Sequence, residues 1–267
     1  MQLRNTTTLV TGASAGLGRE IARLIVREQA GNVIVAARRR ERLDGLVEEF
    51  KSVQSAQVTP IALDLSTTEG TNRCFEEAIA TRQLDGAILN AGITYFGKFT
   101  EQGADSIHNI IATNVTGLTL LASRIARHFV ERKIPGRIML VSSMAGFAPM
   151  AYQAVYGATK AYVMSFGLAL REELRGTGVT CTVFCPGGIV TEMSDYSGLS
   201  KTFGPDHASM MDATTCARHA IEAYLARGDV AIPGVSNWAT SVVQRVMPRS
   251  LVTRAIERIY RGALTAK

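Results

Sequence analysis

The sequence is poor in cysteine, proline and tryptophan, with four cysteines, seven prolines and one tryptophan among 267 residues. The cysteines form no CxxC pair and have no histidine cluster beside them, so the sequence predicts no metal site. Cys181 and Cys185 fall on one face of an expected strand, roughly 13 Å apart, which is too far for a disulfide. We therefore expect buried free thiols in a reducing compartment.

Long apolar runs and export signals are also missing. No stretch of about 18 apolar residues occurs, so we expect no segment that spans a membrane. The residues before the first expected strand are few and polar, unlike a signal peptide. With 46% hydrophobic and 19% charged residues, the composition excludes a disordered or collagen-like chain. These absences predict a soluble, cytoplasmic protein.

Basic residues outnumber acidic ones by 29 to 23, for a formal net charge of +6. The excess is local, because residues 245–267 carry a net +5, residues 38–42 carry +3, and the rest of the chain sums to −2. A nucleic-acid-binding domain carries a basic face and a recognisable motif, so we expect no nucleic-acid partner. The pattern indicates an anionic small molecule and a separate contact at the C-terminus.

Apolar, strand-like runs alternate with helix-period segments along most of the chain. This alternation predicts an α/β fold, a doubly wound, Rossmann-type parallel sheet of about seven strands with helices on both faces. We expect one domain over residues 1–232 and a basic, amphipathic helical appendage over 233–267, with an irregular insertion at 189–211. The expected strands are Thr8–Thr11, Asn32–Ala37, Val58–Leu63, Ala87–Leu89, Arg137–Val141, Val179–Cys185 and Val230–Ile232. The expected helices are 16–30, 41–50, 66–81 (opened by a capping box at Ser66), 105–132, 153–175 and 212–227 (capped by Asp212).

A glycine-rich turn follows the first expected strand. Its spacing is G-x-x-x-G-x-G, and glycine allows a positive φ and a close approach of the backbone to a pyrophosphate. The helix behind the turn offers free N–H groups and a positive dipole end to an anion. The turn is interpreted as a dinucleotide-phosphate site, with a plain strand-to-helix turn as the alternative. Its residues are Gly12, Ser14, Ala15, Gly16, Leu17 and Gly18.

Basic residues end the second expected strand, where NAD sites usually carry an acidic residue for the ribose 2′-hydroxyl. Here Ala37 is followed by Arg38 and Arg39, whose forked donors suit a phosphate. The predicted cofactor is therefore NADP(H), and a solvated basic helix start is the alternative. Asp64 and Leu65 are expected beside the adenine, although Asp64 could instead serve a turn or a helix cap.

Four groups fall at the carboxyl edge of the expected sheet, where ligands bind in this architecture. Tyr156 and Lys160 share a helix face at i, i+4. A nearby ammonium lowers the pKa of a phenol, which is near 10 when unperturbed. Tyr156 could then exchange a proton with a carbonyl or carbinol oxygen held by a serine. The other three groups are Asn90-Ala91-Gly92, Asn114 and Ser142-Ser143.

In combination, these motifs resemble the short-chain dehydrogenase/reductase family in its single-domain form, over about residues 6–232. The resemblance implies that residues 1–232 are an NADP-binding and catalytic domain. It is carried by Thr11-Gly12-x3-Gly16-x-Gly18, Asn90-Ala91-Gly92, Asn114, Ser143, Tyr156-x3-Lys160 and Pro186-Gly187.

The family's roles follow for the matching positions. Tyr156 would be the general acid/base, Lys160 would hold the nicotinamide ribose and lower the pKa of Tyr156, and Asn114 would hold a water in a proton relay. Ser143 would orient the substrate oxygen, chosen over Ser142 because it stands thirteen residues before Tyr156. The further cofactor contacts implied are Asn90, Ala91, Gly92, Pro186, Gly187, Ile189 (backbone) and Thr191 (carboxamide). Ala15 departs from members with a basic residue there, which leaves the NADP preference to Arg38 and Arg39.

The resemblance implies an NADP(H)-dependent oxidoreductase that interconverts a carbonyl and an alcohol by hydride transfer. A hydrophobic ketone or aldehyde is the expected substrate, because the loops at this edge are apolar and methionine-rich. Ordinary loop packing is the alternative for those residues. A catalytically idle NADP(H)-binding sensor is the alternative function. The loop residues are Phe96, Met144, Phe147, Met150, Met193, Tyr196, Phe203, Met210 and Met211.

Two expectations concern partners. The resemblance implies a homodimer or homotetramer formed through the helices at 105–132 and 153–175. Residues 237–267 combine apolar residues with spaced arginines. This segment could be a lid or subunit contact, an amphipathic contact with an anionic membrane, or a solvated end.

Overall fold

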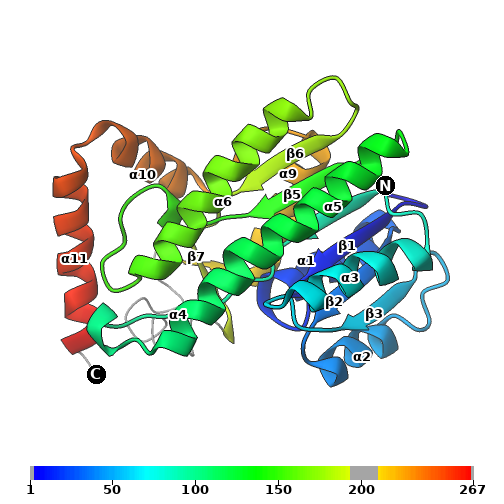
Figure 1. The fold of residues 1–267 in the computed structure, drawn as a ribbon, viewed down its shortest axis with the longest axis horizontal. Helices are drawn as coiled ribbons and strands as arrows, with labels where there is room; N and C mark the ends of the chain where they lie inside the picture. Colours follow the sequence, from blue (N-terminus) through cyan, green and yellow to red (C-terminus); the bar gives the residue numbers. More distant parts are fainter. Residues whose placement is uncertain (1–2, 193–209, 266–267) are drawn as a thin grey trace.

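Seven parallel strands form the central sheet in a computed structural model that describes residues 3–192 and 210–265 (Figure 1). The strand order is β3-β2-β1-β4-β5-β6-β9. The chain therefore builds outward from β1 to one edge and then crosses back to β4 on the other side of β1, so the order reverses there. The predicted doubly wound parallel sheet is confirmed. Its strands are β1 (Thr7–Thr11), β2 (Asn32–Ala37), β3 (Val58–Ala62), β4 (Gly86–Leu89), β5 (Arg137–Val141), β6 (Thr180–Phe184) and β9 (Val230–Ala231).

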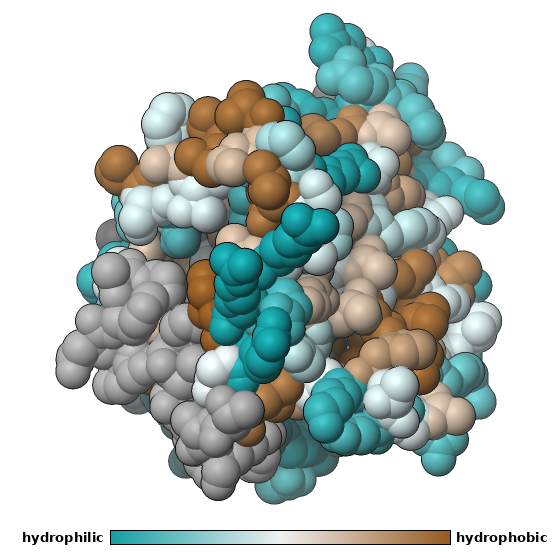
Figure 2. Space-filling model, turned by 90° about the vertical axis from the view of Figure 1, so that its left-hand side faces the viewer, coloured by the Kyte–Doolittle hydropathy of each residue, from teal (hydrophilic) through white to brown (hydrophobic). Residues whose placement is uncertain are grey.

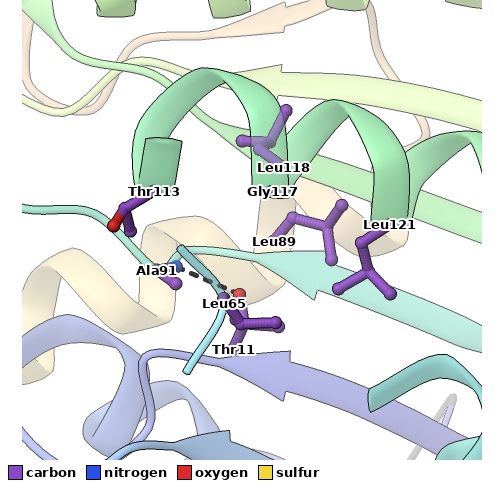
Figure 3. A pocket seen from close by; sticks show the side chains of 8 residues that line it. All are labelled: Thr11, Leu65, Leu89, Ala91, Thr113, Gly117, Leu118 and Leu121. Carbon is purple, nitrogen blue, oxygen red and sulfur yellow. Dashed lines mark hydrogen bonds between the residues drawn. The ribbon is translucent and has the colours of Figure 1, made fainter. Parts of the chain in front are cut away.

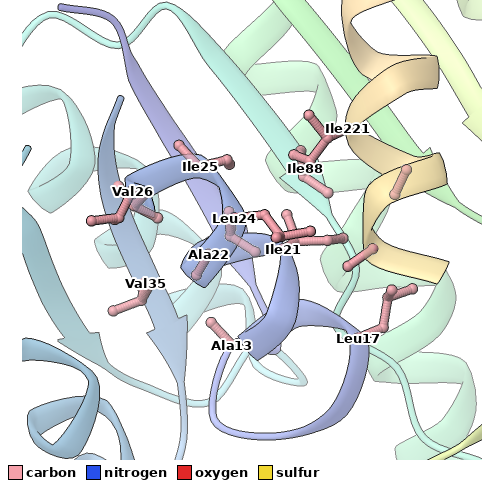
Figure 4. Close-up of a cluster of buried hydrophobic side chains, with 14 of the residues drawn as sticks. Ala13, Leu17, Ile21, Ala22, Leu24, Ile25, Val26, Val35, Ile88 and Ile221 are labelled. Carbon is pink, nitrogen blue, oxygen red and sulfur yellow. The ribbon is translucent and has the colours of Figure 1, made fainter. Parts of the chain in front are cut away.

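Helices cover both faces of this sheet, each over its own apolar cluster. One cluster lies beneath α1 (Gly16–Gln29), α2 (Arg40–Glu49) and α9 (Ala213–Ala226). The other lies beneath α3 (Thr68–Thr81), α5 (Leu118–Glu131) and α6 (Ala154–Glu173). Figure 4 shows how α1 directs one apolar stripe toward Val35 of β2, Ile88 of β4 and Ile221 of α9. The stripe comprises Leu17, Ile21, Leu24 and Ile25, spaced at the helical period.

Two local predictions were wrong. The cap of α3 is Thr67, whose hydroxyl accepts the Gly70 N–H at 2.9 Å, while the N–H of Ser66 is taken by Asp64. The segment at 189–211 is not irregular at its ends, because β7 (Gly188–Val190) pairs in parallel with β8 (Met210–Asp212). Residues 193–209 lie outside the described residues. The predicted cap of α9 is confirmed, since the Asp212 carboxylate accepts the Thr215 N–H at 2.8 Å.

The helix predicted over 105–132 contains one wide turn. It runs as α4 (Ala104–Ile111), a π-helical segment (Ala112–Gly117) and then α5. Gly117 permits this packing, because a Cβ at that position would lie 2.0 Å from the carbonyl oxygen of Leu65. Asn114 occupies the middle of the wide turn and is buried. Single π turns inside α-helices often occur at functional sites.

Two C-terminal helices leave the sheet after β9 and lie at the left end of the molecule in Figure 1. They are α10 (Val235–Val246) and α11 (Arg249–Thr265). Val252 of α11 is buried, and Glu257 accepts a hydrogen bond from the Tyr152 hydroxyl at 3.1 Å. α11 therefore packs against the loop before α6. Among the described residues, no helix is long and apolar enough to cross a bilayer. Short 3-10 turns occur at Phe99–Glu101 and Met144–Gly146.

Two glycines give a matched stability test. Gly117→Ala should lower the free energy of unfolding by about 1–3 kcal/mol, because the new methyl group overlaps the Leu65 carbonyl. Gly45→Ala, in the exposed middle of α2, should raise it by about 0.4–1 kcal/mol, because nothing lies within 4 Å and the unfolded chain loses entropy. Urea denaturation of both variants checks this pair. Equal effects would contradict a packing role for Gly117.

Candidate active site

The glycine turn packs tightly against the end of β4. Gly12 and Gly16 have φ values of +70° and +55°, which favour glycine. A Cβ on Gly12 would lie 2.9 Å from the side-chain nitrogen of Asn90, and one on Gly18 would lie 2.6 Å from that nitrogen and from the Gly12 carbonyl oxygen. The glycines are therefore required by the protein's own packing, in addition to any ligand that approaches the turn.

Thr11 and Asn90 join the carboxyl ends of β1 and β4. The Thr11 hydroxyl accepts the N–H groups of Asn90 and Ala91, each at 3.0 Å, and the Asn90 amide donates to the Thr11 carbonyl at 3.0 Å. The Asn90 side chain thus holds the two strands together. Figure 3 shows Thr11, Ala91 and Leu65 around a cavity of about 10 Å³, which α5 closes. That space is about enough for one water molecule.

The predicted basic group lies beside the glycine turn. The Arg39 guanidinium donates to the Ser14 hydroxyl at 3.1 Å and to Glu192 at 3.3 Å. Arg42 also donates to Glu192, and its hydrogen bond, with that of Arg39, lowers the pKa of this carboxyl. Arg38 lies 4.0 Å from Asp64 across an exposed ion pair. Sequence reasoning missed Arg42 and Glu192, although Arg42 stands three residues after Arg39 on one helix face.

Ser143 and Tyr156 meet at the carboxyl end of β5. The Ser143 side chain lies near the Tyr156 hydroxyl, and the Ser143 oxygen accepts the Ala145 N–H at 3.1 Å. Burial raises the pKa of Tyr156, and the nearby Ser143 hydroxyl opposes this only in part. Burial therefore dominates the pKa of Tyr156 in this structure, and the expected lowering by Lys160 stays a prediction. The Lys160 ammonium lies 5.7 Å from the phenol ring centre and donates to the Val141 carbonyl at 2.9 Å.

Lys160 and Asn114 face a common space beside Gly92. Burial lowers the pKa of Lys160 to about 8. Asn114 exchanges two hydrogen bonds with the Ile93 backbone, at 2.9 and 3.0 Å, and donates to the Thr159 hydroxyl at 3.1 Å. A Cβ on Gly92 would lie 3.3 Å from the Asn114 oxygen and 3.5 Å from the Lys160 nitrogen. The fold therefore brings all four predicted catalytic residues to one edge, with Thr159 as a support that the sequence did not reveal.

The loop after β6 closes over the same edge. The Pro186 carbonyl accepts the Met144 N–H at 2.8 Å, which ties this loop to the one that carries Ser143. Thr191 approaches the glycine turn, since its methyl carbon lies 3.1 Å from the position of a Cβ on Gly16. Ile189 is half-buried against the apolar cluster under α1. A Cβ on Gly187 would lie 2.6 Å from the Asn237 side chain of α10, a contact that sequence reasoning missed.

Apolar residues and α11 enclose the side of the site that faces Tyr156. Phe96 packs edge-on against Tyr260, with ring centres 5.4 Å apart. Burial, together with the nearby Tyr156, raises the pKa of Tyr260 to about 12. The predicted loop residues Phe147 and Met150 contact Arg245 and the start of α6, while Met211 packs on the core. Met193, Tyr196 and Phe203 lie outside the described residues.

Three comparisons relate this arrangement to known proteins. A family model described as short chain dehydrogenase matches residues 6–201. An uncharacterised oxidoreductase of Myxococcus xanthus is 35% identical over 198 residues, which is 74% of this chain and 77% of that protein. The L-xylulose reductase of Caenorhabditis elegans is 35% identical over 188 residues, 69% of this chain and 72% of that protein. The solved short-chain dehydrogenase of Sphingobium yanoikuyae in complex with NADPH has a TM-score of 0.79 and 29% identity, covering 90% and 93% of the two chains.

The buried amine should give the stability of the protein a distinctive pH dependence. Between about pH 8 and the ordinary value of 10.5, the folded protein has lost the Lys160 proton while the unfolded chain keeps it. The free energy of unfolding of the wild type should therefore rise with pH over this window, relative to Lys160→Met. Urea titrations at pH 7.5, 9 and 10 measure the difference.

Ser142→Ala is the matched control for this experiment. It removes the hydrogen bond from the Ser142 hydroxyl to the Lys160 carbonyl, 2.7 Å long, but leaves the amine in place. It should keep the pH trend of the wild type. Parallel pH curves for the wild type and Lys160→Met would show that the amine is not desolvated.

Proposed function

Because the chain belongs to the short-chain dehydrogenase/reductase family of oxidoreductases, we propose that it interconverts a carbonyl compound and its alcohol with NADP(H). We propose further that it acts mainly as a reductase of a hydrophobic ketone or aldehyde. The observation that carries this proposal is the placement of Tyr156 near Ser143 and with its ring centre 5.7 Å from the ammonium of the buried Lys160.

The glycine turn supports the binding of a dinucleotide. The helix α1 has no side-chain cap at Ala15 and no acidic residue in its first turn, so its N-terminal N–H groups stay open to an anion. Gly12, Gly16 and Ser14 would hold the pyrophosphate, while Ile189 and Thr191 would hold the nicotinamide end. NADP(H), when bound, supplies or accepts the hydride.

The arginines beside this turn support a preference for the 2′-phosphate. Arg39 and Arg42 converge on the Glu192 carboxylate, which accepts the same kind of donors that a phosphate would accept. The Arg39–Glu192 pair is exposed and therefore weak, so a doubly charged phosphate can replace the carboxylate. Arg38 precedes Arg39 in the chain, lies 4.0 Å from Asp64, and would add a third guanidinium.

Proton transfer in this proposal begins at Tyr156. Its raised pKa keeps the phenol protonated at neutral pH, which suits a general acid for carbonyl reduction. The hydroxyl of Ser143 donates to the substrate oxygen, and the O–H bond of Tyr156 breaks as the new O–H bond of the alcohol forms. Lys160, with a pKa of about 8, can return a proton near neutral pH through a water held at Asn114.

Two alternatives are less well supported. An idle NADP(H) sensor has no need for the contact between Ser143 and Tyr156, or for a buried amine beside it. A polar sugar, as in the name of the nematode relative, fits poorly beside Phe96 and Tyr260. A panel of aromatic, alicyclic and sugar carbonyls separates these readings, because turnover of sugars alone would contradict the hydrophobic substrate.

We also propose a cytoplasmic homodimer or homotetramer in which residues 233–267 are an appendage to the domain at 1–232. All four cysteines are buried free thiols, as in a reducing compartment. A groove of about 430 Å³ runs between the π turn and α6, and apolar Tyr162 and Leu168 are exposed farther along α6. Such a face suits a second copy of the chain. The groove is lined by Ile111, Val115, Ala154, Val155, Ala158 and Thr159.

Tyr156→Phe tests the acid. Loss of the hydroxyl should lower kcat for NADPH-dependent carbonyl reduction by about 10²- to 10⁴-fold, while NADPH binding, followed by nicotinamide fluorescence, stays close to that of the wild type. Tyr162→Phe on the same helix is the control, because its hydroxyl bonds only to Thr119 among the contacts described. Retained turnover in Tyr156→Phe would refute the assignment of Tyr156 as the general acid.

Arg39→Ala tests the phosphate preference. It should reduce the ratio of kcat/KM for NADPH over NADH by roughly 10- to 100-fold, since it removes charge-assisted hydrogen bonds. Arg40→Ala is the control, because Arg40 is exposed and paired with Asp44 on its own helix. An unchanged ratio in Arg39→Ala, or a wild type that prefers NADH, would refute the NADP(H) proposal.

A further inference from the structure

Exposed apolar side chains gather on the C-terminal helices. Fourteen large hydrophobic residues are exposed among the residues that the structure describes, and eight of them fall between residues 235 and 259. Soluble monomers rarely expose such a concentration unless it is used for binding. The eight are Val235, Trp238, Val242, Val243, Val246, Met247, Leu251 and Ile259.

The helix α10 is amphipathic, but its apolar side faces outward and its polar side faces the domain, which is the reverse of a helix that packs on a core. Val235, Trp238 and Val246 recur at the helical period and are 83%, 58% and 77% exposed. Its residues that face the domain are polar, with Ser241 buried and Asn237 packed against Gly187. Burial in the protein's own core therefore does not explain the apolar stripe.

Arginines surround this apolar face. The two helices and their connection carry five arginines and one acidic residue, Glu257, among residues 235–265. Glu257 already pairs with Arg261 and accepts from Tyr152. In Figure 2 hydrophobic surface gathers at the height of α10, and a hydrophilic band runs below it at the height of α11. Of the other arginines, Arg249, Arg254 and Arg258 are exposed, while Arg245 stacks on Phe147 of the domain.

These two properties together select one class of partner. A second copy of the chain would bring arginine against arginine with few carboxylates to pair them. A nucleic acid would leave the valine stripe in water. The surface of an anionic bilayer offers the headgroup–acyl boundary to the apolar face and phosphates to the arginines, and tryptophan favours that boundary. We propose that α10 and α11 lie in the surface of an anionic lipid bilayer.

The inner faces of the same helices enclose the site. Arg245 stacks over Phe147 at 5.2 Å, and Tyr260 packs on Phe96 beside Tyr156. A bilayer bound to the outer faces therefore lies next to the substrate side of the site. Resting on the proposed function, this placement lets an apolar carbonyl compound pass from the lipid to Tyr156.

Vesicle flotation of the full-length protein tests the surface. The wild type should float with vesicles of phosphatidylcholine and phosphatidylglycerol, bind less in high salt, and bind phosphatidylcholine vesicles only weakly. Trp238→Ser with Val246→Ser should weaken binding by roughly tenfold or more. Phe99→Ser with Val130→Ser is the matched control, because it removes one exposed aromatic residue and one exposed valine elsewhere.

The arginines have their own pair of variants. Arg254→Gln with Arg258→Gln should weaken binding to anionic vesicles by roughly tenfold or more and flatten its salt dependence, because the negative surface potential attracts each arginine. Arg73→Gln with Arg175→Gln removes two exposed arginines elsewhere, one on α3 and one in the turn after α6, and should leave binding unchanged.

The outcomes separate this proposal from its rivals. Failure of the wild type to float, or equal binding by test and control variants, overturns it. If light scattering shows that Trp238→Ser with Val246→Ser dissociates an oligomer while the wild type ignores vesicles, the face is a subunit contact and the proposal is wrong. Turnover of a water-soluble carbonyl without vesicles should be unchanged in these variants. Absence of that turnover in the wild type would reject the proposed function without affecting the flotation result.

Discussion

The junction between β1 and β4 is the constraint on which the rest of the site depends. Thr11 and Asn90 tie the two carboxyl ends together through three hydrogen bonds, and Gly12 and Gly18 let the turn pack within van der Waals distance of them. The sheet reverses its strand order there, so helices leave toward opposite faces and the edge stays open. The glycine turn, the π turn and the end of β5 all meet at this edge.

Desolvation then decides the chemistry of the groups placed there. Burial raises the pKa of Tyr156 and lowers that of Lys160 to about 8, so both groups favour their neutral forms more than they would in water. A neutral phenol and an amine that titrates near physiological pH suit the proposed roles of proton donor and proton source. The π turn at Asn114 adds the polar lining between that amine and Ile93.

The C-terminal helices have an inner face that packs on the site and an outer face that is exposed. Their inner residues close the site through Tyr260 and Glu257, and their outer residues form an apolar, arginine-rich face. The domain leaves the outer face exposed. We propose a bilayer surface as its environment, which would place the lipid phase beside the candidate site.

Short-range patterns in the sequence were enough for much of this protein. The alternation of strands and helices predicted the sheet. The glycine spacing and Arg38-Arg39 predicted the turn with its basic neighbour, and the i, i+4 spacing predicted that Tyr156 and Lys160 share one helix. Each of these patterns depends on residues a few positions apart. Two local features differed from the prediction. The cap of α3 is Thr67, one residue from the expected position, because Asp64 takes the Ser66 N–H. The strand β7 forms because it pairs with β8, more than twenty residues later. Only the tertiary structure decided the direction of the Tyr156 pKa, the contact of Arg39 and Arg42 with Glu192, and the outward turn of the α10 stripe. Those properties come from burial and from contacts between segments far apart in the chain, and no local pattern encodes them.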